Sequence, residues 1–117
     1  MSPEAESFLP LPHLPLHIML ALAEEETAHG YAIIKRIGEM TRGVTSPSSG
    51  SLYLAMVRLE ERGLLEGVEG EEPEADGRRK YYRLTRLGRR VLEAESRRLA
   101  GLVGRARAAD VLPRGAE

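Results

Sequence analysis

The sequence predicts a mainly α-helical fold with one small β-hairpin, and three observations support this. Apolar residues recur at helical spacing in three segments before residue 63. Two short runs rich in Val, Leu and Tyr then flank a polar stretch of glycine, proline and acids, which is typical of a hairpin with a long loop. A last segment, residues 85–110, returns to helical spacing with apolar residues seven apart.

Length and composition limit the classes to which the chain can belong. Its 117 residues suffice for one domain with a modest core, and 42% apolar with 30% charged residues indicate a folded chain. Cysteine is absent, which excludes disulfides, thiolate metal sites and cysteine nucleophiles. Residues 1–26 carry acids where a secretory signal needs positive charge, and their longest apolar run is far shorter than a membrane span. We therefore expect a cytoplasmic protein without a membrane partner.

Residues 1–12 predict a flexible N-terminal arm, because they hold three prolines and two acids. A first helix follows, in which Pro15 occupies the first turn, where proline is tolerated. The second helix spans residues 30–43 and ends at a glycine. Its apolar residues fall on one face: Ile33, Ile34, Ile37 and Met40.

The third helix is expected to begin after Ser48, a good N-cap residue, and to end at Gly63. At 100° per residue, one face collects apolar residues for the core: Leu52, Ala55, Met56 and Leu59. The opposite face holds Leu54 and Val57, with Ser51 and Arg58 beside them.

Strands over residues 64–69 and 79–84 form the expected hairpin, and Thr85 caps the long final helix. We expect domains at residues 13–84 and 85–110, followed by a tail at 111–117. Three helices followed by a two-stranded wing is the winged helix-turn-helix arrangement.

Positive charge is concentrated in one segment of a chain whose net charge is only −1. Residues 77–90 carry seven cationic side chains and no acid, whereas residues 60–76 carry eight acids. Such a distribution is compatible with a surface that meets a polyanion.

Three segments together resemble the PadR family of bacterial transcriptional regulators. They are "HGYAIIKRI" (29–37), "SPSSGSLYLAMVRLEERGLL" (46–65) and "GRRKYYRLTRLGRRVL" (77–92). The family reads roughly H-G-Y-x-I-x-K, S-P-G-S-L-Y-x-A-L-x-R-L-E-x-x-G-L-I and G-R-x-R-x-Y-Y-x-L-T-x-x-G. Ser49 and Leu54 stand where the family often has proline, which leaves the preferred DNA sequence open. The length resembles the short branch, which has a single C-terminal helix.

The resemblance implies a homodimeric regulator, most simply a repressor that a small molecule releases from an inverted-repeat operator in double-stranded DNA. The third helix would enter the major groove, and basic residues would contact phosphates. The expected DNA-binding residues are Lys35, Ser48, Ser49, Ser51, Leu54, Val57, Arg58, Arg78, Arg79 and Lys80. The expected dimer interface joins the final helix to the first and comprises Ile18, Leu20, Leu22, Leu92, Leu99, Leu102, Val103 and Ala106.

One alternative remains, a winged-helix module that binds protein partners through exposed Leu54 and Val57. An enzyme is not expected, because the sequence shows no nucleophile–base pair and no phosphate-binding glycine loop. His13 and His17 are four residues apart but lack a third ligand at defined spacing, so we expect no metal and no cofactor. His29 is expected to cap the second helix. The four tyrosines are expected to pack with polar tips: Tyr31, Tyr53, Tyr81 and Tyr82.

Overall fold

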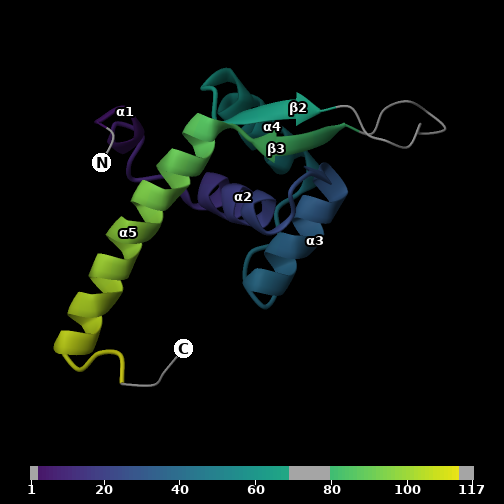
Figure 1. The fold of residues 1–117 in the computed structure, drawn as a ribbon. Coiled ribbons are helices and arrows are strands. Elements are labelled where there is room, and N and C mark those ends of the chain that lie inside the picture. Colours follow the sequence, from purple (N-terminus) through teal and green to yellow (C-terminus); the bar gives the residue numbers. More distant parts are fainter. Residues whose placement is uncertain (1–2, 69–79, 114–117) are drawn as a thin grey trace.

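The computed structural model describes residues 3–68 and 80–113 of the chain (Figure 1). It contains three helices that form a head, a small antiparallel sheet, and a long helix α5 that leads away from the head. The principal extents are 54 × 33 × 22 Å, and α5 accounts for the elongated shape. The predicted mainly helical, winged fold is confirmed.

The head is built from α2 (His13–Glu24), α3 (Gly30–Met40) and α4 (Ser49–Glu61). Each of these helices contacts the other two. Their buried side chains form one core with residues from the sheet and from α5. The core face expected for α3 is confirmed, since Ile33 and Ile37 are fully buried and Ile34 and Met40 are half-buried.

The predicted helix ends are also confirmed. The Ser48 hydroxyl accepts a hydrogen bond from the Ser51 amide at 3.1 Å, and Thr85 caps α5 (Arg86–Ala108) through the Gly88 amide. Gly43 and Gly63 both have φ of +80°, the left-handed conformation that follows a helix and favours glycine. Each of these signals acts on residues only a few positions away, which is why the sequence alone predicts the helix ends.

The wing is a three-stranded sheet, whereas the sequence predicted two strands. Strands β2 (Leu65–Val68) and β3 (Tyr81–Leu84) form the expected antiparallel pair. A short strand β1 (Ala28–His29) adds to the other edge of β3, with Ala28 opposite Tyr82. The His29 ring then accepts a hydrogen bond from the Ala32 amide and caps α3, as expected.

The N-terminal segment is not the flexible arm that the sequence predicted. Residues Pro3–Glu6 form a short helix, α1, that packs against α5. Ala5 and Leu11 are buried, with exposures of 2% and 7%. The prolines and acids of this segment face solvent or end the helix, while two apolar side chains hold it on the protein.

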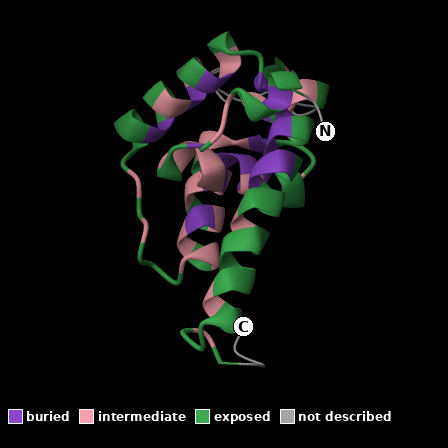
Figure 2. Cartoon of the chain, turned by 90° about the vertical axis from the view of Figure 1, so that its left-hand side faces the viewer, coloured by how far each residue is buried: buried purple, intermediate pink, exposed green. Residues whose placement is uncertain are grey.

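Helix α5 is anchored at its N-terminal half and projects at its C-terminal half. The anchored half buries Val91, Leu92 and Ala94, and the Gly88 backbone lies directly against the Leu64 carbonyl. From residue 96 onward the helix is exposed or half-buried, as the green and pink lower turns in Figure 2 show.

Candidate nucleic-acid interface

Helix α4 presents one face to the core and the opposite face to solvent. Leu52, Met56 and Leu59 are buried, with exposures of 2–3%. On the outer face Leu54 is 56% exposed, Val57 is half-buried and Arg58 is exposed. The helical geometry therefore gives this α4 surface two apolar side chains and one cation, all pointing away from the core.

The N-terminus of α4 carries a group of hydroxyls. Ser48 is engaged as the cap, and its Oγ lies 3.0 Å from the Ser51 Oγ. Ser49 and Ser51 are exposed. Helix N-termini carry unpaired amides and partial positive charge, so this end of α4 is suited to phosphate oxygens.

Two tyrosines lie where the sequence analysis did not expect them. Tyr31, at the start of α3, is 76% exposed, and Tyr53, on α4, is 62% exposed. The expectation that they pack was wrong for both, although it holds for Tyr82, which is buried. Burial raises the pKa of the Tyr82 hydroxyl above its ordinary value. Phase analysis of α4 could have found Tyr53, because it lies one residue from Leu52 and so about 100° from the core direction.

The base of the wing carries cations that are partly neutralised. Lys80 lies 3.4 Å from the Glu60 carboxylate and 5.2 Å from the centre of the Tyr82 ring. Arg83 donates to Glu66 at 2.8 Å. Arg78 and Arg79 lie outside the described residues. Lys80 thus joins the wing to α4, and an anion would have to compete with Glu60 for it.

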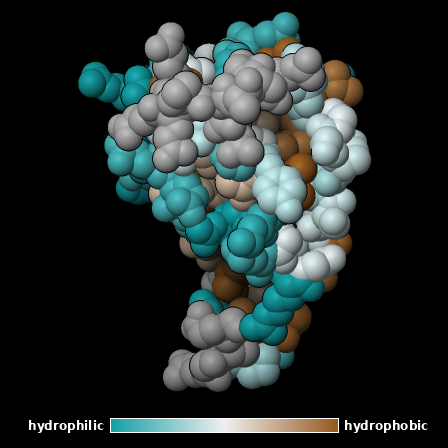
Figure 3. All heavy atoms as spheres, turned by 90° about the vertical axis from the view of Figure 1, so that its right-hand side faces the viewer, coloured by the Kyte–Doolittle hydropathy of each residue, from teal (hydrophilic) through white to brown (hydrophobic). Residues whose placement is uncertain are grey.

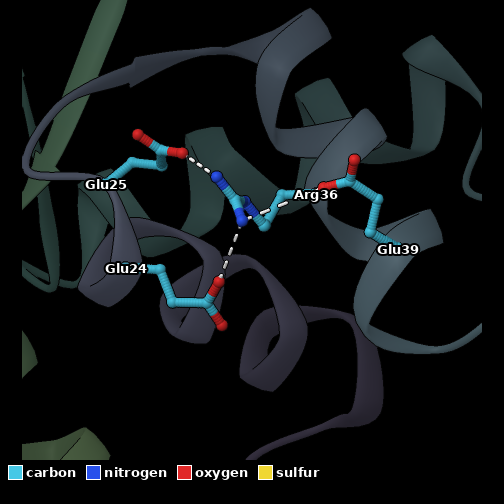
Figure 4. Close-up of polar contacts among 4 residues, drawn as sticks. All are labelled: Glu24, Glu25, Arg36 and Glu39. Atoms are coloured by element: carbon cyan, nitrogen blue, oxygen red, sulfur yellow. Dashed lines mark hydrogen bonds and ion pairs between the residues drawn. The ribbon is translucent and has the colours of Figure 1, made fainter.

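Adjacent residues Lys35 and Arg36 on α3 differ in their surroundings. The Arg36 guanidinium is bound by Glu24, Glu25 and Glu39, and Figure 4 shows the three carboxylates around it. The hydrogen bond from Arg36 to Glu25 raises the pKa of the guanidinium. Lys35 is exposed and makes no ion pair with any residue that the structure describes. Of the two, Lys35 is therefore the cation available to a phosphate.

The hydropathy of the surface differs between its sides. Figure 3 views the molecule from the right-hand side of Figure 1, and the described residues on the left of this view are mostly hydrophilic. Toward the right edge, which is the far side of Figure 1, where α4 lies, residues of intermediate hydropathy alternate with hydrophobic ones.

The expected dimer residues divide into two groups. Ile18, Leu22 and Leu92 are buried in the core of the single chain, with exposures of 0%, 1% and 6%. Including them in an interface was wrong, because they have no side-chain area left for a partner. The other expected residues keep side-chain area that a partner could cover, because each is half-buried or exposed: Leu20, Leu99, Leu102, Val103 and Ala106. Four of these form an i, i+3, i+4, i+7 stripe along the projecting half of α5.

His13 and His17 both lie on α2, although Pro15 separates them. Their ring centres are 4.4 Å apart, and His17 Nδ1 lies 2.8 Å from the His13 carbonyl oxygen. Over residues 3–68 and 80–113, no group of three or more His, Asp or Glu residues is placed to hold a metal ion.

A model of the transcriptional regulator PadR-like family matches residues 19–94, which include the second half of α2, all of α3 and α4, the sheet and the anchored half of α5. The chain belongs to the PadR family. This confirms the resemblance drawn from the three sequence segments. Because the family consists of transcriptional regulators, the exposed outer face of α4 is a candidate for contact with DNA.

Three individual proteins are also similar to this chain. A PadR family transcription regulator from Clostridium difficile R20291 is 27% identical, with a TM-score of 0.68 over 83% of this chain and 97% of that one. An uncharacterized protein X of Lysinibacillus sphaericus is 35% identical over 64% of this chain and 68% of its own. An uncharacterized 37.1 kDa protein of transposon Tn4556 from Streptomyces fradiae is 38% identical over 75% of this chain, which spans only 23% of that protein's length.

No helix within the described parts of this PadR-like chain is both long enough and apolar enough to span a lipid bilayer.

Proposed function

We propose that this PadR-like chain is a homodimeric, sequence-specific DNA-binding repressor that acts in the cytoplasm, on an inverted-repeat operator. The observation that supports the proposal best is the outer face of α4. It carries exposed hydroxyls at a helix N-terminus, followed by Leu54 and Arg58, and none of these is used by the core. An exposed helix of this kind is what the major groove of B-DNA accommodates.

The contacts divide by chemistry. Ser49, Ser51 and the free amides of α4 take phosphate oxygens, and Lys35 adds a phosphate contact from α3. Leu54 and Val57 meet thymine methyl groups, which distinguish A·T pairs in the major groove. Arg58 is suited to a guanine or to a phosphate. Lys80, Arg78 and Arg79 would contact the backbone beside the groove.

Dimerisation supplies the rest of the specificity, because one head contacts few base pairs. The stripe on the projecting half of α5 is apolar, with Leu102 52% exposed and Val103 40% exposed. A second copy of the chain would remove this stripe from water. Once one head of a dimer is bound, the second is held at a high effective concentration near its own half-site, so the linked heads bind one duplex more tightly than separate heads would. The half-site centres would lie about 10 bp or a multiple of 10 bp apart. A small molecule that changes the spacing of the heads would release the DNA.

A titration of the full chain with labelled duplex DNA at several salt concentrations tests the proposal. Footprinting on genomic DNA then identifies the operator. We expect a protected inverted repeat, and heterologous DNA bound more weakly with a comparable salt dependence. An absence of any duplex binding at low salt contradicts the proposal.

A second candidate function rests on the exposure of Leu54. A winged-helix module that binds a protein partner through Leu54 and Val57 would need the same exposed surface. It predicts that the Leu54→Ala variant loses the partner and binds DNA normally.

A further inference from the structure

A half-open groove lies between the start of α2 and the outer side of α4. Its volume is about 560 Å³, which falls within the range of about 300–1,000 Å³ typical of small-molecule sites. One wall is formed by Leu11, Pro12 and the start of α2, and a hydrogen bond from the Leu11 amide to the Glu95 carboxylate ties this wall to α5. The other wall is α4, the helix proposed to enter DNA. The groove therefore adjoins the candidate nucleic-acid interface.

The floor of the groove is aliphatic. No aromatic side chain lines it, so it offers an aliphatic chain dispersion contacts and offers an aromatic ring no stacking partner. Its apolar lining residues include Leu11, Pro12, Leu14, Leu54, Ala55 and Leu59.

Two arginines stand at the rim of the groove, one helical turn apart. Arg58 and Arg62 both line it, and Glu61 is the one acid among its lining residues. The Arg62 guanidinium is held over the Phe8 ring, with 4.5 Å between Cζ and the ring centre. Neither arginine forms an ion pair within the described part of the chain. The rim therefore has an excess of positive charge and guanidinium groups that favour a carboxylate.

We propose that this groove binds a small aliphatic carboxylate of the medium-chain fatty acid type. Its carboxylate would lie on Arg58 and Arg62, and its chain would lie against Leu14 and Leu54. Charge complementarity at the rim and the aliphatic floor together select this class over a neutral or a cationic molecule.

Occupation of the groove would exclude DNA, and this consequence rests on the DNA-binding function proposed above. Leu54 and Arg58 belong both to the groove and to the outer face of α4. A ligand that covers Leu54 and neutralises Arg58 removes an apolar contact and a cation from the DNA interface. The ligand would therefore act directly on α4, the helix proposed to contact the DNA bases.

The site is tested first without DNA, on the full chain, by NMR of isotope-labelled methyl groups. Octanoate is the probe, and 1-octanol is the matched neutral probe of equal chain length. We expect octanoate to shift the Leu14 and Leu54 methyl signals saturably. The double variant Arg58→Ala with Arg62→Ala should weaken octanoate at least about tenfold and leave octanol unchanged.

Two control variants separate the site from the general charge of the protein. Arg58→Glu reverses one charge at an exposed position and should also weaken the binding of octanoate, while Arg90→Ala, exposed on α5, should leave the affinity for octanoate unchanged. Thermal unfolding establishes that each variant is folded. Equal affinity for octanoate and octanol, or an affinity that is insensitive to the two arginines, overturns the proposal. So do groove signals that move on dilution without ligand, because a second copy of the chain would then occupy the groove.

Competition is measured next, by adding octanoate to a complex of the protein with labelled duplex DNA. We expect octanoate to lower the apparent DNA affinity and octanol to leave it unchanged. Saturable binding in the groove with no loss of DNA affinity refutes the competition. If the protein binds no DNA at all, the proposed function fails, and the titration without DNA still tests whether octanoate binds in the groove.

Discussion

The backbone amide of Leu11 donates a hydrogen bond to the carboxylate of Glu95, with 2.9 Å between Leu11 N and Glu95 Oε2. The two residues are 84 positions apart in the chain. Arg98 donates to the same carboxylate through Nε at 2.5 Å and through a second guanidinium nitrogen at 3.1 Å. Glu95 is fully buried, so this carboxylate fastens the N-terminal segment to α5 inside the protein.

We predict that Glu95→Ala lowers the free energy of unfolding by about 1–3 kcal/mol, because it leaves the Leu11 amide without its acceptor and Arg98 without its counter-ion. The matched control is Glu93→Ala, two positions earlier. Its exposed pair with Arg97, at 3.6 Å, is worth no more than about 0.5 kcal/mol. Urea unfolding of both variants measures the difference. Equal effects would show that the buried carboxylate adds nothing to stability.

The same carboxylate predicts a pH dependence of stability. The hydrogen bond from Arg98 holds the pKa of Glu95 below its ordinary value of 4.5, and the Leu11 amide lowers it further. Because the folded pKa is depressed, the stabilisation is present above about pH 4.5 and is lost as the pH falls through the folded pKa. Glu95→Gln cannot ionise, so the difference in stability between the natural chain and this variant should shrink as the pH is lowered from 7 to 3. A difference that is constant over this range contradicts the prediction.

Gly88 illustrates a close approach that only glycine permits. A Cβ atom built there would lie 2.1 Å from the Leu64 carbonyl oxygen, which belongs to the backbone and cannot rotate away. We predict that Gly88→Ala destabilises the fold by about 1–3 kcal/mol or more. Gly101→Ala is the control on the same helix, since nothing lies within 4 Å of its Cβ position. Alanine should stabilise α5 there by about 0.5–1 kcal/mol. Thermal unfolding of the two variants should shift in opposite directions.

The sequence predicted the helices and their ends well, because those signals are local. Ser48 and Thr85 accept hydrogen bonds within their own helices, and Gly43 and Gly63 end helices through their own conformations. What it missed depends on distant partners. Strand β1 has only two residues, too few to show the alternation of apolar and polar side chains that predicts a strand. It forms only by pairing with β3. The N-terminal segment reads as a loose arm because Glu95 and α5 are far away in the sequence.

The candidate site shows the same division. Helical phase alone placed Leu54 on the outer face of α4, and it is exposed there. Phase could not decide whether Ile18 and Leu22 belong to the core or to an interface, because α2 is apolar around much of its circumference. Nor could it separate Lys35 from Arg36, whose three acidic partners come partly from another helix.

The apolar stripe on the projecting half of α5 makes the proposed dimer testable. Leu102→Lys places a charge in the apolar stripe and should weaken a dimer at least about tenfold, since burial of one Leu is worth about 1.5–3 kcal/mol. Ala108→Lys adds the same charge at an exposed position on the opposite side of α5 and should leave the dimer intact. Sedimentation at several concentrations compares them. Substitution is preferable to truncation after Glu93, because truncation would also remove the buried Glu95. A natural chain that is monomeric at micromolar concentration refutes the dimer.

The contrast between Lys35 and Arg36 tests the DNA interface. Lys35 is exposed without an acidic partner in the described structure, whereas Arg36 is held by three carboxylates. If Lys35 contacts a phosphate, Lys35→Ala should reduce the slope of log affinity against log salt by about 0.9, on operator and random DNA alike. Arg36→Ala removes a cation of equal charge from the next position, yet it should leave that slope unchanged, because its charge is already neutralised within the protein. Leu54→Ala should instead leave the slope intact and reduce discrimination at one base pair of each half-site, by about 1–3 kcal/mol at most. Fluorescence anisotropy with operator, mutated operator and random duplexes at four or more salt concentrations measures all three. Equal slopes for the Lys35 and Arg36 variants would mean that α3 does not contact the DNA backbone through Lys35.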